Sequence, residues 1–385
     1  MASVTAPKQG SATALDLRSS IFGARAVFFL LGIVFSTWAS RIPAIRDALQ
    51  LNPAELGTVL LSAGAGAMVA FPVASKLVTR RGSSGATWSS GVALACLLGS
   101  LPWAPNMLSL MALMVLLGAS QVCFNVSINA MGGELESTAG RSILSMLHAW
   151  YCVGALCGGL MGSALAGAGW NARAHLDIVA VALLTLLWWS CRRLPSATRR
   201  EAPAGGFGLP REALGIGLIC CCASIAEGAV TDWSSVYMRD QLHSSEGMAP
   251  IAFCAFAAFM LAVRLVADRL KDRLGARRIV LLGALAAAAG LSVAVAAPGW
   301  ACTVAGFALA GAGMAPVFPF VMSAASTQGP RALAGVATLA YSGILVGPPI
   351  IGFVAQALGL QVALAIVAMT SLLIAALSAR ARALR

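Results

Sequence analysis

Long apolar stretches follow one another along almost the whole chain, and short breaks with Pro, Gly and basic residues separate them. A helix needs about 20 mostly apolar residues to cross a bilayer. Each stretch has roughly that length and is apolar on all sides, as expected of helices in lipid. The pattern predicts twelve transmembrane spans, at residues 21–41, 54–78, 84–102, 107–130, 142–167, 174–194, 212–238, 248–268, 277–297, 300–325, 332–358 and 361–380.

The composition supports a membrane protein and excludes other classes. Hydrophobic residues make up 59% of the 385 residues and charged residues 10%, against about 25% charged in ordinary soluble domains. A soluble fold could not cover so much apolar surface, and a disordered chain would not contain it. The ten cysteines lie in or beside apolar stretches without a C-x-x-C pair. We therefore expect neither disulfides nor a metal site, and no cofactor.

The basic residues predict the orientation. The net charge of +12 is spread over short clusters between the spans, which argues against a nucleic-acid-binding face. Cytoplasmic segments of membrane proteins are enriched in Lys and Arg. If both termini are cytoplasmic, all but five of the 26 basic residues fall inside, the exceptions being Arg41, Arg46, Arg173, Arg239 and Arg264.

The chain divides at mid-length into two repeats. The stretch 195–211 is rich in Pro, Gly and Arg and is typical of a linker. An offset of 193 residues places Arg46-Asp47 on Arg239-Asp240, and Lys76 to Gly82 on Arg269 to Gly275. Parallel six-helix repeats are typical of transporters. We expect a cytoplasmic tail at 1–20, a six-helix bundle at 21–194, a cytoplasmic linker at 195–211 and a second six-helix bundle at 212–385.

Twelve spans in two repeats, with basic loops after spans two and eight, resemble the major facilitator superfamily. The segment D-R-L-K-D-R-L-G-A-R-R at 268–278 is similar to the superfamily's cytoplasmic D-R-x-G-R-R motif, whereas Thr79 of the first loop stands where the motif has Asp. The resemblance implies an all-α membrane fold of two pseudo-symmetric bundles. It also implies loops that clamp the two halves on the cytoplasmic side, which assigns gating to Asp272, Arg273, Gly275 and Arg80.

Finer detail is similar to one bacterial branch. The segments W-A-S-R-I-P at 38–43 and E-G-A-V-T-D-W-S-S-V-Y at 227–237 resemble a group near fucose permease that includes the YbjJ-type inner-membrane proteins. Fucose-permease-like symporters use carboxylates on spans one and four, and this chain has none there. Sugar specificity and proton coupling are therefore not carried over.

Two acids of span seven are candidates for function. Glu227 is the only acid deep within an apolar span, where a charge costs about 2.5–3.5 kcal/mol on insertion scales. It either titrates protons or binds substrate, or it forms a structural hydrogen bond between helices. Asp232 lies about 140° further around the helix and reaches the same cavity only if Gly228 lets the helix distort. Otherwise it pairs with Arg41 or orients the turn before Arg239.

Arg41 and two tryptophans are candidates at the outer mouth. Arg41 ends span one and either binds anions or gates this mouth, or it is an interfacial arginine that snorkels. Trp38 and Trp233 occupy nearly matching positions of the repeats. Each either flanks the site or anchors its helix at the membrane interface.

Polar side chains also mark spans four, five and eleven. An amide stripe on span four either lines a cavity or forms hydrogen bonds between helices; it consists of Gln121, Asn125 and Asn129. His148, which shares a face with Tyr151, either relays protons with Glu227 or is a neutral structural histidine. Tyr341 completes the candidate substrate and coupling residues.

Two further features concern helix ends and bends. Arg264 and Asp268 have i,i+4 spacing and lead into the second basic loop, where they form either a structural ion pair or part of the gate clamp. Pro316 and Pro319 are expected to kink span ten, and Pro348 and Pro349 span eleven.

These features predict a secondary active transporter. The phosphate-binding pattern G-x-x-x-x-G-K-[ST] is absent, so the energy must come from a gradient, and one deep carboxylate with a histidine favours protons. We expect a monomeric multi-pass protein of the bacterial inner membrane that moves a small solute by alternating access. It either imports a small polar or anionic solute, as the resemblance implies, or exports a small metabolite, drug or siderophore. A membrane enzyme or sensor is a remote alternative, because H-E-x-x-H and G-x-S-x-G are absent.

The predicted orientation can be tested on the linker. Single cysteines placed at 195–211 in a cysteine-free background should react with an impermeant maleimide only after the cells are permeabilised. A control cysteine between spans five and six should react in intact cells. Reaction of the linker from outside would reverse the orientation.

Overall fold

The computed structural model describes residues 14–141, 143–194, 211–296, 299–381 and 384. Within these ranges all regular secondary structure is helical, and a short 3-10 helix, Leu101–Trp103, follows α2. The α-helices are α1 (Ala14–Ala48), α2 (Pro53–Ser100), α3 (Met107–Ala139), α4 (Leu144–Gly167), α5 (Ala172–Cys191), α6 (Arg211–Gln241), α7 (Ile251–Leu274), α8 (Ala276–Ala296), α9 (Trp300–Met314), α10 (Val317–Thr327), α11 (Pro330–Leu358) and α12 (Leu360–Arg380).

The helices contain the predicted spans. Ten helical segments are long and apolar enough to cross a membrane. One of them, Pro53–Trp103, has 51 residues. As one straight helix it would measure about 76 Å, more than twice the hydrocarbon core, so it holds spans two and three. The shorter apolar helix Ile251–Ala267 within α7 accounts for span eight.

Asparagine caps and prolines set several helix boundaries. The side chain of Asn52 accepts a hydrogen bond from the Glu55 backbone N–H, and the Glu55 carboxylate accepts one from the Asn52 backbone N–H, which fixes the start of α2. Pro316 separates α9 from α10 within span ten, as predicted. α1 continues through Pro43 to Ala48. Arg41 therefore lies well inside this helix, whereas the sequence had suggested that it lies at the helix end.

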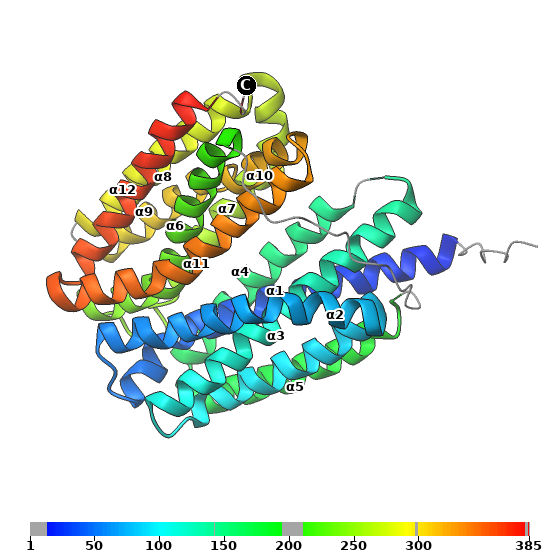
Figure 1. The fold of residues 1–385 in the computed structure, drawn as a ribbon. Helices are drawn as coiled ribbons and strands as arrows, with labels where there is room; N and C mark the ends of the chain where they lie inside the picture. The colour runs from blue at the N-terminus through cyan, green and yellow to red at the C-terminus, as the bar shows by residue number, and fades with distance from the viewer. Residues whose placement is uncertain (1–13, 142, 195–210, 297–298, 382–383, 385) are drawn as a thin grey trace, which may run out of the picture.

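The helices form two bundles, α1–α5 and α6–α12 (Figure 1). In the first, α2 packs against α3 and α1 against α4; in the second, α6 packs against α11 and α8 against α9. The bundles meet where α2 contacts α11 and α4 contacts α7. The predicted linker falls almost wholly on residues 195–210, and most of the predicted tail on residues 1–13; both lie outside the described residues.

Two glycines at equivalent repeat positions turn the chain in the same way. Gly82 has φ 69° and ψ 168° and interrupts α2 between spans two and three. Gly275 has φ 80° and ψ 149° and separates α7 from α8. Positive φ favours glycine because it has no Cβ. Residues that the 193-residue offset makes equivalent therefore have similar backbone conformations.

A second equivalent pair brings helix backbones into close contact. A Cβ on Gly118 of α3 would overlap the carbonyl oxygen of Ala63 on α2, and one on Gly311 of α9 would overlap that of Phe256 on α7. Gly118 and Gly311 are 193 residues apart, and so are Ala63 and Phe256. Small residues let helices in lipid gain van der Waals contact, since lipid tails supply no hydrophobic force between them.

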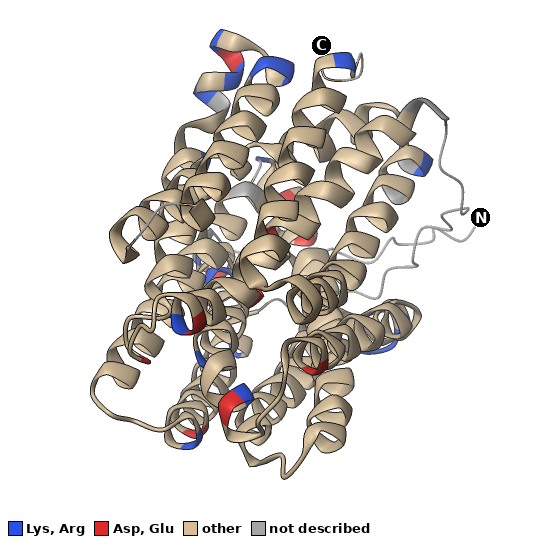
Figure 2. Ribbon diagram, turned by 90° about the vertical axis from the view of Figure 1, so that its left-hand side faces the viewer, with Lys and Arg blue, Asp and Glu red and all other residues tan. Residues whose placement is uncertain are grey.

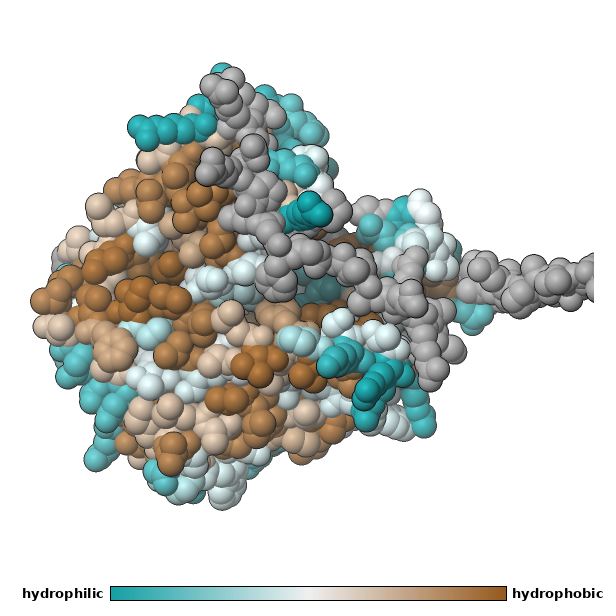
Figure 3. Space-filling model, viewed as in Figure 1, coloured by the Kyte–Doolittle hydropathy of each residue, from teal (hydrophilic) through white to brown (hydrophobic). Residues whose placement is uncertain are grey.

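Apolar side chains cover the sides of the molecule, and charged ones lie mainly at its two ends. Figure 2 shows most Lys, Arg, Asp and Glu residues near helix ends, with few between. Figure 3 shows hydrophobic residues across the middle of the visible face and hydrophilic ones toward its edges. Large exposed apolar residues such as Val69, Val181 and Leu265 fit a surface whose solvent is lipid.

The glycine contact predicts a large effect from one methyl group. Gly118→Ala should destabilise the protein by about 1–3 kcal/mol through overpacking, seen as a lower thermal unfolding temperature in detergent. Gly133→Ala on the same helix is the matched control, because a Cβ there meets nothing within 4 Å. Equal unfolding temperatures for the two variants would contradict the packing argument.

Candidate functional site

A group of charged and polar side chains lies between the two bundles. Glu227 of α6 acts electrostatically on Arg264 of α7 and on Tyr151 of α4, without a direct ion pair to a described residue. Glu227, Arg264 and Tyr151 are each half-buried. The group joins residues from both repeats, so a rearrangement of the bundles must change its geometry.

Arg264 is the member that sequence analysis did not assign to the site. Its Nη1 donates to Sγ of Cys152 on α4 at 3.1 Å, and its Nε donates to the carbonyl of Ala315 at 3.4 Å. The expected partner, Asp268, has a side chain outside the described residues. Arg264 therefore bridges the first bundle and the break between α9 and α10. The available signal was an arginine within an apolar span.

Amides of α3 extend this group to the histidine of α4. Nδ2 of Asn129 donates to Oδ1 of Asn125 at 2.6 Å, and Nε2 of His148 lies 3.2 Å from Oδ1 of Asn129. The stripe therefore forms hydrogen bonds both within its own helix and to a second helix. Gln121, one turn before Asn125, is half-buried.

His148 is exposed and lies beside an aromatic ring. Its ring is 5.2 Å from that of Phe28 in an edge-on arrangement. Arg264 acts electrostatically on His148 and is itself acted on by Glu227. The expected histidine–glutamate relay therefore has an arginine as the neighbour common to both groups.

Asp232 does not join Glu227 on one face. α6 is continuous through Gly228, so the distortion that would bring the two acids together is not seen, and they stay about 140° apart. Asp232 is half-buried, with no hydrogen bond or ion pair to a described residue.

The aromatic candidates lie inside the protein. Trp233 is 0% exposed and Trp38 is 7% exposed, so neither anchors a helix at the membrane interface. Tyr341 packs edge-on against Phe71 of α2, with ring centroids 4.7 Å apart. It therefore contributes to the contact between α11 and the first bundle.

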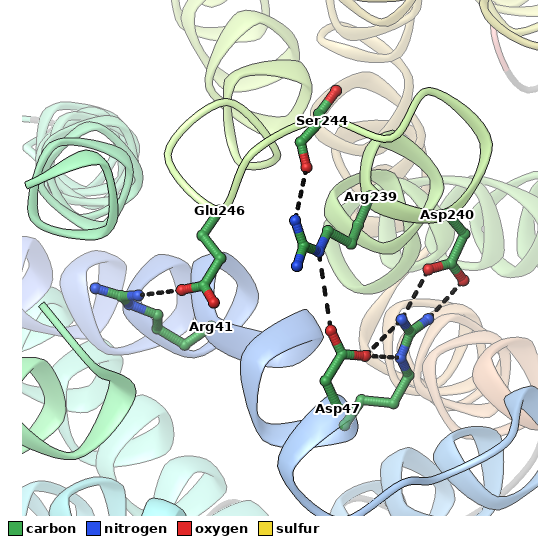
Figure 4. A network of polar contacts seen from close by, with 7 residues as sticks. Arg41, Asp47, Arg239, Asp240, Ser244 and Glu246 are labelled. Carbon is green, nitrogen blue, oxygen red and sulfur yellow. Dashed lines mark hydrogen bonds and ion pairs between the residues drawn. The ribbon is translucent and has the colours of Figure 1, made fainter. Parts of the chain in front are cut away.

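An ion-pair network joins the ends of α1 and α6 (Figure 4). The two terminal nitrogens of Arg46 donate to Asp240 at 2.5 and 2.7 Å. Arg239 lies 3.9 Å from Asp47. The dipeptides Arg46-Asp47 and Arg239-Asp240 are equivalent in the two repeats, and the structure pairs each arginine with the other repeat's aspartate. The bundles are thereby held together at this end.

Arg41 belongs to the same end of the interface. Its Nη1 lies 3.4 Å from Glu246, in the turn after α6, and its Nε donates to Nδ1 of His175 on α5 at 2.9 Å. The side chain of Arg41 is 1% exposed. The snorkelling alternative is therefore wrong, and so is pairing with Asp232. His175, which is fully buried, carries no sequence signal that distinguishes it.

The predicted gating loops lie at the opposite end. Arg80, Asp272 and Arg273 are exposed and form no hydrogen bond or ion pair with a described residue. Gly275 acts as the turn residue described above. The bundles converge at the end that carries the Arg–Asp network and diverge toward the gating loops (Figure 1). A clamp between these loops stays a prediction for another conformation.

Comparisons with known proteins identify the class. The family model of the Major Facilitator Superfamily matches residues 26–342 and 216–384. The chain therefore belongs to this superfamily of membrane transporters, which are not enzymes, and it is a multi-pass membrane protein.

Individual relatives agree with this assignment. An uncharacterized transporter, y4wD, of Sinorhizobium fredii is 31% identical over 92% of this chain and 96% of its own length. An uncharacterized MFS-type transporter of Yersinia pestis is 32% identical over 93% of this chain and 94% of its own length. A mutant of the nucleoside transporter NupG shares the fold with a TM-score of 0.77 and 14% identity, over 94% and 99% of the two chains. FucP in the outward conformation also shares the fold, with a TM-score of 0.65 and 15% identity, over 94% of this chain and 98% of its own.

The ion-pair network is expected to control opening at this end of the interface. Asp240→Asn removes a charged acceptor of two hydrogen bonds, each worth about 1.5–3 kcal/mol. The population with separated α1 and α6 ends should therefore rise at least about tenfold. Spin labels at Leu108→Cys and Ser245→Cys in a cysteine-free background would report longer distances.

Asp47→Asn is the matched control for this experiment. The contact of Asp47 across the interface is its 3.9 Å distance to Nε of Arg239. Loss of its charge should therefore lengthen the distances between the spin labels much less. An unchanged distance distribution in Asp240→Asn would contradict a gating role for the network.

Proposed function

We propose that the protein is a proton-coupled secondary transporter that moves a small solute across the bacterial inner membrane by alternating access, with Glu227 as the coupling carboxylate. The observation that carries the proposal is the position of Glu227 between the bundles, within electrostatic range of Arg264 and Tyr151. A carboxylate there is accessible to one side at a time as the bundles rock.

The neighbouring arginine supports a polar or anionic solute. An ionised Glu227 partly neutralises the positive charge of Arg264. A proton on Glu227 removes the negative charge of this carboxylate. The guanidinium is then available to a carboxylate or phosphate of the solute, and Asn129, His148 and Tyr151 offer hydrogen bonds from the first bundle. Binding of proton and solute is thereby favoured together, which is the energetic requirement for coupling.

The conformation described above corresponds to one state of this cycle. With the predicted orientation, the Arg–Asp network closes the periplasmic end, and the site opens to the cytoplasm. In the opposite state Asp272, Arg273, Gly275 and Arg80 close the cytoplasmic end. Trp38, Trp233 and Asp232 lie along the outer part of the pathway, together with Arg41. The protein acts as a monomer, because each chain contains both bundles.

Glu227→Gln tests the proposal. A thermal-stabilisation screen of the purified protein against a metabolite panel first identifies a solute. Uptake driven by a pH gradient and solute counterflow are then measured on the same proteoliposomes. The variant should lose pH-driven accumulation and keep counterflow, since counterflow needs no net proton movement.

Each other outcome has a distinct meaning. Joint loss of binding and counterflow would assign Glu227 to solute binding. Lower thermal stability with intact accumulation would assign it a structural role. Asp177→Asn, which removes an acid of α5 that accepts a hydrogen bond from Trp103 and is not assigned to the site, is the control and should retain accumulation. Full accumulation by Glu227→Gln would refute the coupling role.

A further inference from the structure

A groove of about 510 Å³ opens on the side of the first bundle, away from the site between the bundles. Its walls come from the two halves of α2 and from α3, and they are apolar except for Arg81 and three serines. Among its lining residues are Val69, Val73, Ala93 and Val115. A volume of this size lies in the range of small-ligand sites.

The groove faces lipid and not the central site. On α3 it is lined by Val115, Ala119 and Cys123, while Asn125 lies about 200° around the helix from Cys123. Val69 is 76% exposed and Val73 is 55% exposed on the opposite wall. Nothing in the groove overlaps the residues assigned to solute or proton.

One end of the groove carries an unpaired positive charge. Arg81 is exposed and forms no hydrogen bond or ion pair with a described residue. The hydroxyls of Ser89 and Ser90 donate to carbonyls of their own helix, so Arg81 is the charged group offered to a ligand. Two further exposed basic residues, Lys76 and Arg80, lie within two turns.

The length of the groove matches one leaflet. From Arg81 to Val69 the helix rises about 18 Å, and half of the hydrocarbon core is about 15 Å. The charge therefore lies at headgroup level, and the apolar walls lie at the depth of the acyl chains. A second copy of the chain would bring its own basic residues to the same face, so like charges disfavour that occupant.

We propose that the groove binds one anionic phospholipid of the leaflet that contains Arg81, with an acyl chain along the apolar walls and the phosphate at the guanidinium. Basic side chains at an anionic surface each contribute an attraction of about 1 kcal/mol, or about fivefold in affinity. The charge selects the headgroup, and the apolar walls retain the chain. The proposal does not depend on the solute or on proton coupling.

Native mass spectrometry of the full-length protein tests this binding. The purified chain is titrated with phosphatidylglycerol or phosphatidylcholine of identical acyl chains. One phosphatidylglycerol should be retained about fivefold more strongly than phosphatidylcholine. Arg81→Gln should abolish the preference, whereas Arg278→Gln, an exposed arginine of the other bundle, should keep it.

Filling the groove tests the acyl-chain part. Ala93→Phe should weaken binding of both lipids, and Ala65→Phe, at an exposed lining position, repeats the test with little risk to folding. Ala376→Phe on the exposed face of α12 is the matched control and should bind like the parent protein. Equal lipid retention by the parent, Arg81→Gln and both groove variants would overturn the proposal. Displacement of the lipid by glycerol phosphate would also overturn it, because a headgroup alone would then suffice.

Discussion

Close approach of helix backbones is the constraint on which this structure depends. In lipid, apolar side chains gain little by meeting one another, so helices associate through van der Waals contact and polar bonds. Gly118 against Ala63 and Gly311 against Phe256 supply such contact at equivalent places in the two bundles. Between the bundles, Gly57 of α2 meets Gly352 of α11. Because both surfaces are backbone, they can slide without repacking long side chains.

The polar groups follow from this packing. Once α4 and α7 are in contact, Arg264 reaches Cys152 of the other bundle, and Glu227 lies near both Arg264 and Tyr151. The charges are thus located where the two rigid bodies meet and not within either one. A charged residue buried inside a single bundle would keep the same surroundings in every conformation. One located between bundles experiences a different field in each state.

The sequence predicts the architecture well because the bilayer imposes a simple rule on length and polarity. Apolar stretches of about 20 residues and the 193-residue offset account for the spans, the repeats and the turns at Gly82 and Gly275. Side-chain partners are another matter, because hydropathy does not say which faces of two apolar helices meet. Arg41 was expected at a helix end and is buried against His175, and Arg264 was assigned to its own helix although it reaches the other bundle.

The Arg–Asp dipeptides have a consequence for the way this end of the interface opens. Arg46 already donates to Asp47 at 2.7 and 3.0 Å while it holds Asp240. When the bundles separate, this arginine keeps a carboxylate partner on its own helix, and Arg239 keeps an aspartate beside it in the chain. The Arg–Asp dipeptide on each departing face is electrically neutral by itself. For these two dipeptides, opening is therefore an exchange of partners and not a separation of bare charges, whereas the pair of Arg41 and Glu246 must separate.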